Sequence, residues 1–219
     1  YYPRLIETCG FRKAQDLFAY QGLRDQLPAS TERLQPICDQ IIARYNIRLR
    51  TLNRARFRKD VEDFVSIYNR ASPDHWGYVP ITEKEIQHMA KGLRWLIVPE
   101  LAVGAEIDGR LVGAVLALPD YNPRIRQIDG RLFPFGFLRL LRNKQAIRKV
   151  RVAAVYILPE YRLHGLGLVL LRALVPKGLE WGMEEAEYSW VAESNHLSRG
   201  ALEKGGAKRV KSYRVYDCP

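Results

Sequence analysis

The clearest chemical signature in the sequence is the stretch VYILPEYRLHGLGLVLLRAL, residues 155–174. An apolar run predicts a buried strand. Pro159 and a basic turn then lead to Gly165 and Gly167 at the start of a second apolar run, which predicts a helix. The first N–H groups of a helix have no partner within it, and the helix dipole adds partial positive charge. Because glycine has no Cβ, a phosphate can approach this backbone closely. The stretch therefore predicts a phosphate or diphosphate site.

The side chains of the same turn fit this prediction. Arg162 and His164 can donate hydrogen bonds to a phosphate at the rim of the site, and Leu163 and Leu166 complete the loop. A full dinucleotide-binding fingerprint is excluded, because its third glycine and acidic residue are not in register. The alternative is a turn with a purely structural role.

Several strands and helices must position this turn. Thr82 and Glu85 form a capping box, and Asp108-Gly109 predicts a hairpin. Pro176, with a glycine two residues later, is expected to end or kink the helix near Val175. The predicted strands are 47–52, two runs within 101–118, 149–158, 186–192 and 209–217, and the predicted helices are 55–71, 82–97, 165–175 and 195–206. This order predicts an α/β or α+β domain around one mixed sheet.

The strand ending in ILPEYR, followed by RLHGLG at 162–167, resembles the Arg/Gln-x-x-Gly-x-Gly/Ala signature of the GNAT superfamily of acyl-CoA N-acyltransferases. The resemblance covers about residues 47–217. It implies a mixed, mostly antiparallel central sheet flanked by helices, with two central strands splayed apart. It also implies acetyl-CoA as the default co-substrate, or another acyl-CoA, and an amine acceptor that attacks the thioester directly, with no metal.

The resemblance assigns roles along the splayed strands. The main chain of Tyr156, Ile157 and Leu158 is expected to line the thioester, where a backbone N–H would stabilise the oxyanion. Asn195, near the N-cap of the next helix, is expected to face the gap between the strands with Glu193.

The sequence departs from the family at the general acid. Leu202 stands where many members carry a tyrosine, and Leu163 replaces a common glycine of the phosphate loop. Solvent or another phenol would then protonate the departing thiolate, and the candidates are Tyr156, Tyr188 and Tyr213. Glu193 is the first candidate for the base that accepts the proton of the amine. An exposed glutamate at a strand end, with no catalytic role, is the alternative.

The acceptor is expected to bind near SPDHWGYVP, residues 72–80, between the two early helices. In that interpretation His75 contacts the acceptor, and Trp76 and Tyr78 form walls of its pocket. The alternative is that these rings only pack the loop. The acceptor is a small-molecule or lipid-like amine, and the sequence does not determine which.

The net charge of +11 is unevenly distributed. Residues 120–151 hold nine Lys or Arg against Asp120 and Asp129, which implies an anionic partner. Within 128–149, aromatic and leucine residues alternate with the basic ones. Three interpretations stay open: a flap with solvated arginines, a lid over a long acyl chain or apolar acceptor, and an element that inserts into an anionic membrane surface. Nucleic acid is the least favoured partner, because no recognition motif accompanies the charge.

The beginning of the chain resembles its end. Residues 6–20 align without a gap to residues 202–216, with identities at Glu7/Glu203, Gly10/Gly206 and Tyr20/Tyr216. We therefore predict that residues 1–20 are the tail of a preceding GNAT-like domain, with an N-terminal extension as the alternative. Residues 21–46 would be a partly helical linker, and 47–219 the acyltransferase domain, with a basic and aromatic insertion at 120–149.

The remaining features favour an intracellular setting. Cys9, Cys38 and Cys218 are odd in number and form no metal or disulfide pattern, which favours a reducing cytoplasm. No run of 18 apolar residues occurs, so any membrane association would be peripheral, at the inner surface. The rival function is a CoA-binding sensor that has lost the general acid of the reaction. As for partners, a homodimer stays open as an alternative.

Overall fold

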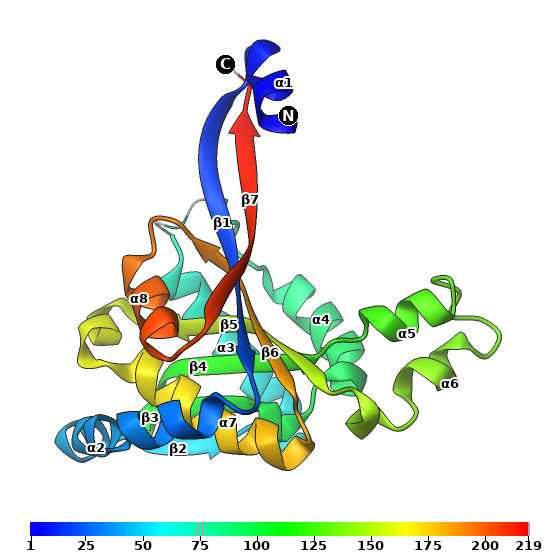
Figure 1. The fold of residues 1–219 in the computed structure, drawn as a ribbon. Helices are drawn as coiled ribbons and strands as arrows, with labels where there is room; N and C mark the ends of the chain where they lie inside the picture. The colour runs from blue at the N-terminus through cyan, green and yellow to red at the C-terminus, as the bar shows by residue number, and fades with distance from the viewer. Residues whose placement is uncertain (74, 76, 219) are drawn as a thin grey trace.

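The computed structural model describes residues 1–73, 75 and 77–218. A single seven-stranded sheet, in the order β2-β3-β4-β5-β6-β1-β7, organises the chain (Figure 1). The strands are β1 (Arg12–Leu23), β2 (Arg48–Thr51), β3 (Ala102–Ile107), β4 (Arg110–Pro119), β5 (Lys149–Ile157), β6 (Glu185–Ala192) and β7 (Lys208–Asp217). The helices are α1 (Tyr2–Thr8), α2 (Leu27–Tyr45), α3 (Phe57–Ala71), α4 (Glu83–Leu96), α5 (Asn122–Gln127), α6 (Gly136–Leu141), α7 (Leu166–Trp181) and α8 (His196–Lys204).

The two central strands separate along their length. β5 and β6 are parallel and pair only over Lys149–Val152 and Glu185–Tyr188, although β5 continues to Ile157 and β6 to Ala192. The other strand pairs are antiparallel. The predicted fold, a mixed and mostly antiparallel sheet with splayed central strands, is confirmed.

Helices cover both faces of the sheet. Successive residues of a strand point to opposite faces. Tyr156 packs against Phe64 of α3, whereas its neighbour Ile157 lies beside Gly167 at the start of α7. α3 and α4 therefore lie on one face, and α7, with α2 packed on it, lies on the other. The main core forms between α7 and the sheet and includes the fully buried Leu170.

Local signals in the sequence are confirmed where the chain turns. Asp108 and Gly109 have φ values of 51° and 74°, the two positive values that a type I′ hairpin needs. Both hydrogen bonds of the capping box between Thr82 and Glu85 are present at the start of α4. The Asn195 side chain accepts a hydrogen bond from the N–H of Ser198, which makes it the N-cap of α8.

Of the two outcomes predicted for Pro176, an end of the helix near Val175 is wrong, and a kink there stays a prediction. α7 continues through Pro176 to Trp181 and ends at Gly182, whose φ is 92°. Proline in a helix interior loses one hydrogen bond and crowds the preceding turn. Tertiary packing offsets that cost here, because Leu174 and Gly178 are buried in the last two turns.

Residues 12–46 are part of the same sheet and core. β1 lies between β6 and β7 and pairs with both, and α2 packs against α7, with Ile41 and Tyr45 against the core. The segment predicted as a partly helical linker is thus mostly one packed helix. The origin of residues 1–20 in a preceding domain stays a prediction.

The predicted basic insertion contains α5 and α6 and projects from the body of the molecule (Figure 1). In the described part of the chain, no helix combines the length and the apolar character needed to cross a bilayer.

Candidate active site

The gap between β5 and β6 exposes backbone donors of β5. The N–H of Leu158 donates to Val112 of β4 at 2.9 Å. Because hydrogen-bonded and non-bonded pairs alternate in an antiparallel ladder, the N–H groups of Ile157 and Val155 face the other way, toward the gap. A β-bulge at Ala153, where the register with β4 shifts, marks the start of this free edge. The edge can pair with an extended ligand and present an N–H to a developing negative charge.

The first turn of α7 closes one end of this edge. Gly165 has a φ of 76°, and a Cβ there would lie 2.6 Å from Cδ1 of Ile41. This position needs glycine both for its backbone conformation and for the close approach of α2. The N–H groups of Leu166 and Gly167, the first two of α7, have no acceptor within the helix, whereas that of Leu168 donates to the carbonyl of Gly165 at 3.1 Å. The anion site predicted at this position stays a prediction, and Gly167 leaves the start of the helix open beside Ile157.

The side chains of the preceding turn are arranged differently from the sequence prediction. Arg162 donates to the carbonyl of Ala71 at the end of α3, so its guanidinium ties the turn to that helix. His164 stacks on Tyr45 with ring centres 4.4 Å apart, and its Nδ1 is buried without a hydrogen-bond partner in the described structure. Leu163 is 87% exposed and leaves the rim open.

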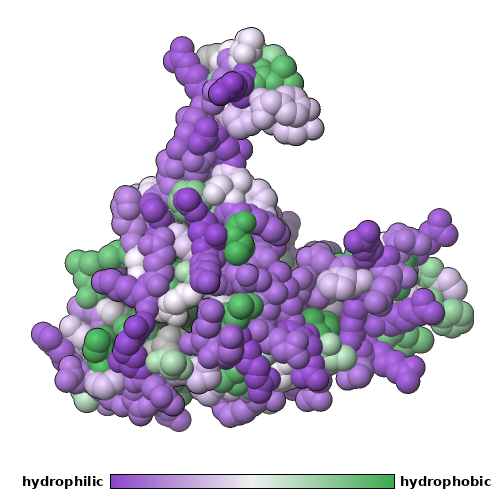
Figure 2. Space-filling view, in the orientation of Figure 1, coloured by the Kyte–Doolittle hydropathy of each residue, from purple (hydrophilic) through white to green (hydrophobic). Residues whose placement is uncertain are grey.

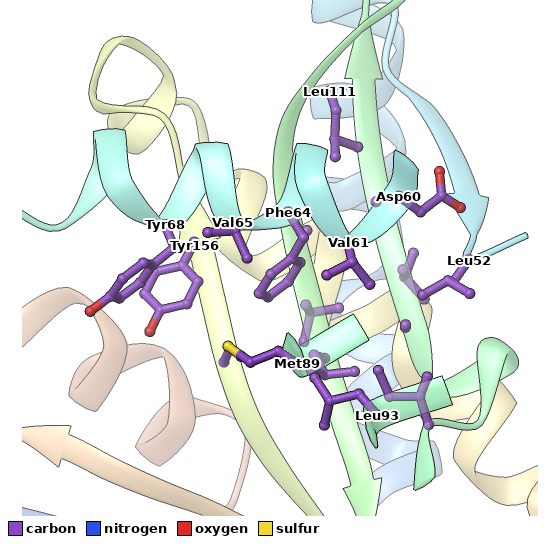
Figure 3. A pocket seen from close by; sticks show the side chains of 18 of the residues that line it. Leu52, Asp60, Val61, Phe64, Val65, Tyr68, Met89, Leu93, Leu111 and Tyr156 are labelled. Atoms are coloured by element: carbon purple, nitrogen blue, oxygen red, sulfur yellow. The ribbon is translucent and has the colours of Figure 1, made fainter. Parts of the chain in front are cut away.

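An apolar cavity of about 360 Å³ lies on the opposite face of the sheet, beneath α3 and α4 (Figure 3). Phe64 of α3 and Met89 of α4 line it, with Ala154 of β5 on the sheet side. The rings of Tyr68 and Tyr156 lie together at one end, with centres 5.1 Å apart. The volume falls in the range of ligand sites.

The other end of the cavity is closed by a paired set of charges. Asp60 is buried, and its carboxylate lies 3.0 Å from the guanidinium of Arg50 and accepts from the N–H of Asn53 at 2.8 Å. Arg50 also bonds Glu106 at 2.5 Å. Burial alone would lower the pKa of Arg50, but its two carboxylate partners raise it overall. These charges form ion pairs with one another, although Asp60 Oδ1 makes no hydrogen bond in the described structure.

Comparison with known proteins agrees with this geometry. Residues 61–206 match the family described as the acetyltransferase (GNAT) family. The chain belongs to the GNAT family. Proteins of this family are acyltransferases that take acyl-CoA as co-substrate.

Two curated relatives resemble nearly the whole chain. Each is 32% identical to it: protein YghO of Escherichia coli strain K12 and the bacterial ceramide synthase of Caulobacter vibrioides. The alignments cover 99% and 98% of this chain but 56% of either relative. The chain thus spans about half the length of these relatives. A GCN5-related N-acetyltransferase from Sphaerobacter thermophilus has the same fold, with a TM-score of 0.67 and 20% identity over 98% of this chain and 55% of its own.

Two of the three predicted GNAT phenols, Tyr156 and Tyr188, lie on opposite faces of the sheet. Tyr156 points into the cavity, and its burial, with a smaller contribution from Tyr68, raises its pKa. Tyr188 lies at the last paired position of β6, on the α7 face, and packs near Leu202. Burial raises the pKa of Tyr188 to about 12. Because of this raised pKa, the hydroxyl of Tyr188 stays protonated at neutral pH. It has no hydrogen-bond partner among the described residues, so it can donate to a ligand.

The GNAT base predicted at Glu193 is held by the N-terminal segment. Its carboxylate bonds Nζ of Lys13 at 2.7 Å, and its N–H donates to the carbonyl of Asp16. The role of Glu193 as a base stays a prediction. Tyr213, the third phenol, packs on Trp190 at the outer end of the sheet.

Sequence reasoning missed a fourth phenol near the position of the missing GNAT tyrosine. Tyr20 of β1 is fully buried against Leu202 and donates to Glu203 at 2.8 Å. Burial and the Glu203 carboxylate raise the pKa of Tyr20. The segment LEKGG was predicted to belong to a helix, and the structure confirms this. The contact of that helix with Tyr20 had no local signal, because Tyr20 and Leu202 are far apart in the chain.

The predicted acceptor loop lies beyond the C-terminus of α3. The N–H of Tyr78 donates to the carbonyl of exposed His75, and the Tyr78 hydroxyl donates to the carbonyl of Asn69 at 3.1 Å. The Tyr78 ring lies 5.6 Å from Tyr68 at the cavity end. Trp76 lies outside the described residues.

Proposed function

We propose that the protein transfers an acyl group from acyl-CoA to the amino group of a long-chain, lipid-like amine. The observation that carries this proposal is the cavity under α3 and α4. It is lined almost entirely by apolar side chains and ends at Tyr68 and Tyr156, beside the free edge of β5. A polar or peptide amine would gain little from this lining, whereas each buried CH₂ of an aliphatic chain contributes about 0.8 kcal/mol.

The free edge of β5 and the start of α7 would hold the co-substrate. The N–H groups at the start of α7 would bind its diphosphate, and the pantetheine arm would pair with β5 across the gap. The N–H of Ile157 or Val155 would donate to the thioester oxygen as negative charge develops there.

Proton transfers complete the reaction. The amine nitrogen bonds to the thioester carbon and loses a proton, with Glu193 as the predicted acceptor, while the C–S bond breaks. Tyr188, kept protonated by burial, would give its proton to the departing sulfur. The products would be an amide and the free CoA thiol.

The name of one relative supports the acceptor class. A ceramide synthase joins an acyl group to a long-chain amino alcohol, and the relative so named aligns with 98% of this chain. On this basis we assign the acceptor here to the same chemical class, with a long-chain acyl-CoA as donor.

The projection formed by residues 121–148, which we call the arm, supports action at a membrane surface. Phe133 and Phe135 at its end are 82% and 70% exposed, and hydrophobic residues gather there among hydrophilic ones (Figure 2). Five arginines of the arm have no ion-pair partner among the described residues: Arg124, Arg126, Arg131, Arg139 and Arg142. One of them, Arg124, bonds backbone carbonyls instead. Exposed aromatic rings beside unpaired cations suit an anionic bilayer at the inner membrane surface.

The arm has a defined structure that holds these groups outward. Arg124 of α5 donates to the carbonyl of Leu140 at 3.0 Å and to that of Arg142. At the base, Tyr121 bonds the carbonyl of Leu96 at the end of α4. The arm is thus tied to the helix that carries Met89 on the cavity wall.

An Ala154→Leu variant tests the acceptor assignment. It adds bulk to the cavity without touching the α7 face, and Ala43→Leu on the exposed side of α2 is the matched control. With hexadecanoyl-CoA, we expect the wild type and Ala43→Leu to release CoA thiol with a long-chain amino alcohol. Ala154→Leu should raise the KM for that acceptor at least tenfold. A preference of the wild type for short polar amines, or an unchanged KM in Ala154→Leu, would contradict the assignment.

The second candidate function is a CoA-binding sensor without turnover. Leu202 favours it, because this buried leucine cannot protonate a thiolate. Tight CoA binding without thiol release, across short and long acyl chains and all amines, would select this alternative.

A further inference from the structure

The two ends of the chain form a matched pair of substructures. α1 and β1 at the start correspond to α8 and β7 at the end when 196 is added to each residue number, as the alignment of Glu7 with Glu203 requires. At each helix end a glycine adopts positive φ, 91° at Gly10 and 87° at Gly206. The N–H of each glycine donates to the carbonyl of the glutamate three residues before it, at 3.0 Å in both cases.

The pairing of β1 with β7 has two-fold symmetry in this numbering. Leu17 pairs with Tyr213, and adding 196 to Leu17 gives Tyr213 itself. This pair therefore maps onto itself, and the two-fold axis passes between its two residues. Each pair on one side of this axis has an equivalent pair on the other side. For example, the pair of Lys13 with Tyr216 corresponds to the pair of Arg209 with Tyr20. The two register shifts of this ladder, between Lys13 and Gln15 and between Ala19 and Tyr20, are also equivalent.

Side chains follow the same symmetry. Tyr20 of β1 donates to Glu203 beside β7, and Tyr216 of β7 donates to Glu7 beside β1. Each tyrosine thus bonds the glutamate of the other substructure. A ladder that is symmetric in backbone register, bulges and side-chain bonds is the arrangement expected of two equivalent units that have exchanged their last strands.

The symmetry is broken at one place. β1 has β6 on its other side, paired from Leu17 to Leu23. The equivalent side of β7, from Tyr213 onward, is the edge of the sheet. Tyr213 is 41% exposed and Val210 47%, and β7 is mostly exposed along its length. A long edge strand of this kind is a ready template for another strand.

We propose that the free edge of β7 binds a strand equivalent to β6 from a second GNAT unit of the same polypeptide. α1 and β1 are the last helix and strand of that unit. The partner strand runs antiparallel to β7 and pairs from Tyr213 toward Cys218, as β6 pairs with β1 from Leu17 toward Leu23. Because Lys13 holds Glu193 of this unit, its equivalent Arg209 would hold a carboxylate of the other.

A second copy of this chain fits the edge less well. The last-strand position beside β6 is already filled by β1, so a copy's β6 has no free edge to offer to β7. The relatives that align with nearly all of this chain have somewhat less than half of their length outside the match. That remainder is enough for one more unit of the size of the family match, residues 61–206.

Hydrogen exchange on the natural gene product tests this proposal without any activity assay. We expect its mass to exceed the 25.3 kDa of the 219-residue chain. Amides of 213–218 should exchange at least tenfold more slowly in it than in the 219-residue chain. β2, the opposite edge strand of the sheet, is the internal control and should exchange equally in both.

Two outcomes would overturn the proposal. One is a natural product of about 25 kDa, in which case slow exchange that depends on concentration would point to a dimer of copies. The other is a longer product whose amides at 213–218 exchange as fast as in the 219-residue chain. Neither outcome bears on the proposed acyl transfer, so the two proposals fail separately.

Discussion

At the scale of single residues, the site contains several phenols, and their surroundings separate them. Tyr156 faces the apolar cavity, Tyr20 donates to Glu203, and Tyr188 lies on the α7 face, where its hydroxyl has no hydrogen-bond partner among the described residues. With leucine at position 202, we propose that another phenol acts as the general acid. The expected role thereby moves to a residue on β6.

Tyr188→Phe is the sharpest test at this scale. Because the hydroxyl has no partner to lose, we expect the free energy of unfolding at pH 7 to change by less than about 0.5 kcal/mol. The kcat should fall by about 10²-fold, the lower range for a lost general acid, with little change in the KM for acyl-CoA. Steady-state kinetics and urea unfolding measure these quantities, and an unchanged kcat would remove Tyr188 from the mechanism.

The same variant has a pH signature in stability. Burial raises the pKa of Tyr188 from 10.0 to about 12 in the folded protein, so the unfolded chain deprotonates first as pH rises. The stability tied to this group is complete below pH 10 and is lost between pH 10 and 12. Tyr188→Phe should therefore lose less stability than the wild type across that interval. Equal losses would show that the phenol is not buried as described.

The residues of the phosphate turn were predictable in position but not in contacts. The glycines and the helix start follow from the sequence, because they depend on local backbone conformation. The Arg162 bond to Ala71 and the stacking of His164 on Tyr45 depend on α2 and α3, which are distant in the chain. Glu193 was predicted at a strand end, but its Lys13 partner lies in a segment that the sequence assigned to another domain.

At the scale of elements, the predictions that depend only on neighbouring residues were correct. The hairpin and the capping box depend on neighbouring residues only, and both are confirmed. The helix was predicted to end or kink near Val175, and the end was placed too early, because burial of Leu174 and Gly178 offsets the cost of the proline between them. The cavity could not be predicted at all, since it arises between α3, α4 and four strands, β2 to β5.

Pro176→Ala tests this balance in α7. Alanine restores an N–H to the helix interior, where proline costs about 3 kcal/mol relative to alanine. We expect the free energy of unfolding to rise by about 1–3 kcal/mol. Pro28→Ala, in the first turn of α2, is the matched control and should change stability by less than about 0.5 kcal/mol, because proline is tolerated there. Urea unfolding measures both, and destabilisation by Pro176→Ala would show that the proline itself fits the α7 packing.

At the scale of the whole molecule, the charge is concentrated where the apolar tip projects. The sequence predicted an anionic partner for this region but left a flap, a lid and a membrane element open. The structure shows the arm projecting away from the body of the molecule (Figure 1). The topology of the N-terminal strand, by contrast, could not be read from composition, because pairing with β6 and β7 is entirely long-range.

Vesicle sedimentation tests the arm. We expect binding to vesicles of phosphatidylglycerol and phosphatidylcholine at low salt, and little binding to phosphatidylcholine alone. Arg131→Glu with Arg139→Glu should weaken binding at least tenfold, since each cation near such a surface contributes about 1 kcal/mol. Phe133→Ser with Phe135→Ser should weaken it as well.

Two double variants control the vesicle experiment. Lys204→Glu with Lys208→Glu matches the charge change away from the arm, and Tyr1→Ser with Tyr2→Ser removes two exposed rings elsewhere. Both should bind nearly as well as the wild type. Equal losses in the arm variants and the controls would attribute binding to net charge alone, and no binding to anionic vesicles would remove the membrane from the account.

The most direct test of the central claim is the identity of the product. The purified protein is incubated with hexadecanoyl-CoA and a long-chain amino alcohol, and the lipid extract is analysed by mass spectrometry. We predict an amine whose mass has increased by one hexadecanoyl group, joined through an amide that resists hydroxylamine, with one CoA thiol released per amide. Thiol release without this amide, or acyl transfer only to short polar amines, would contradict the account.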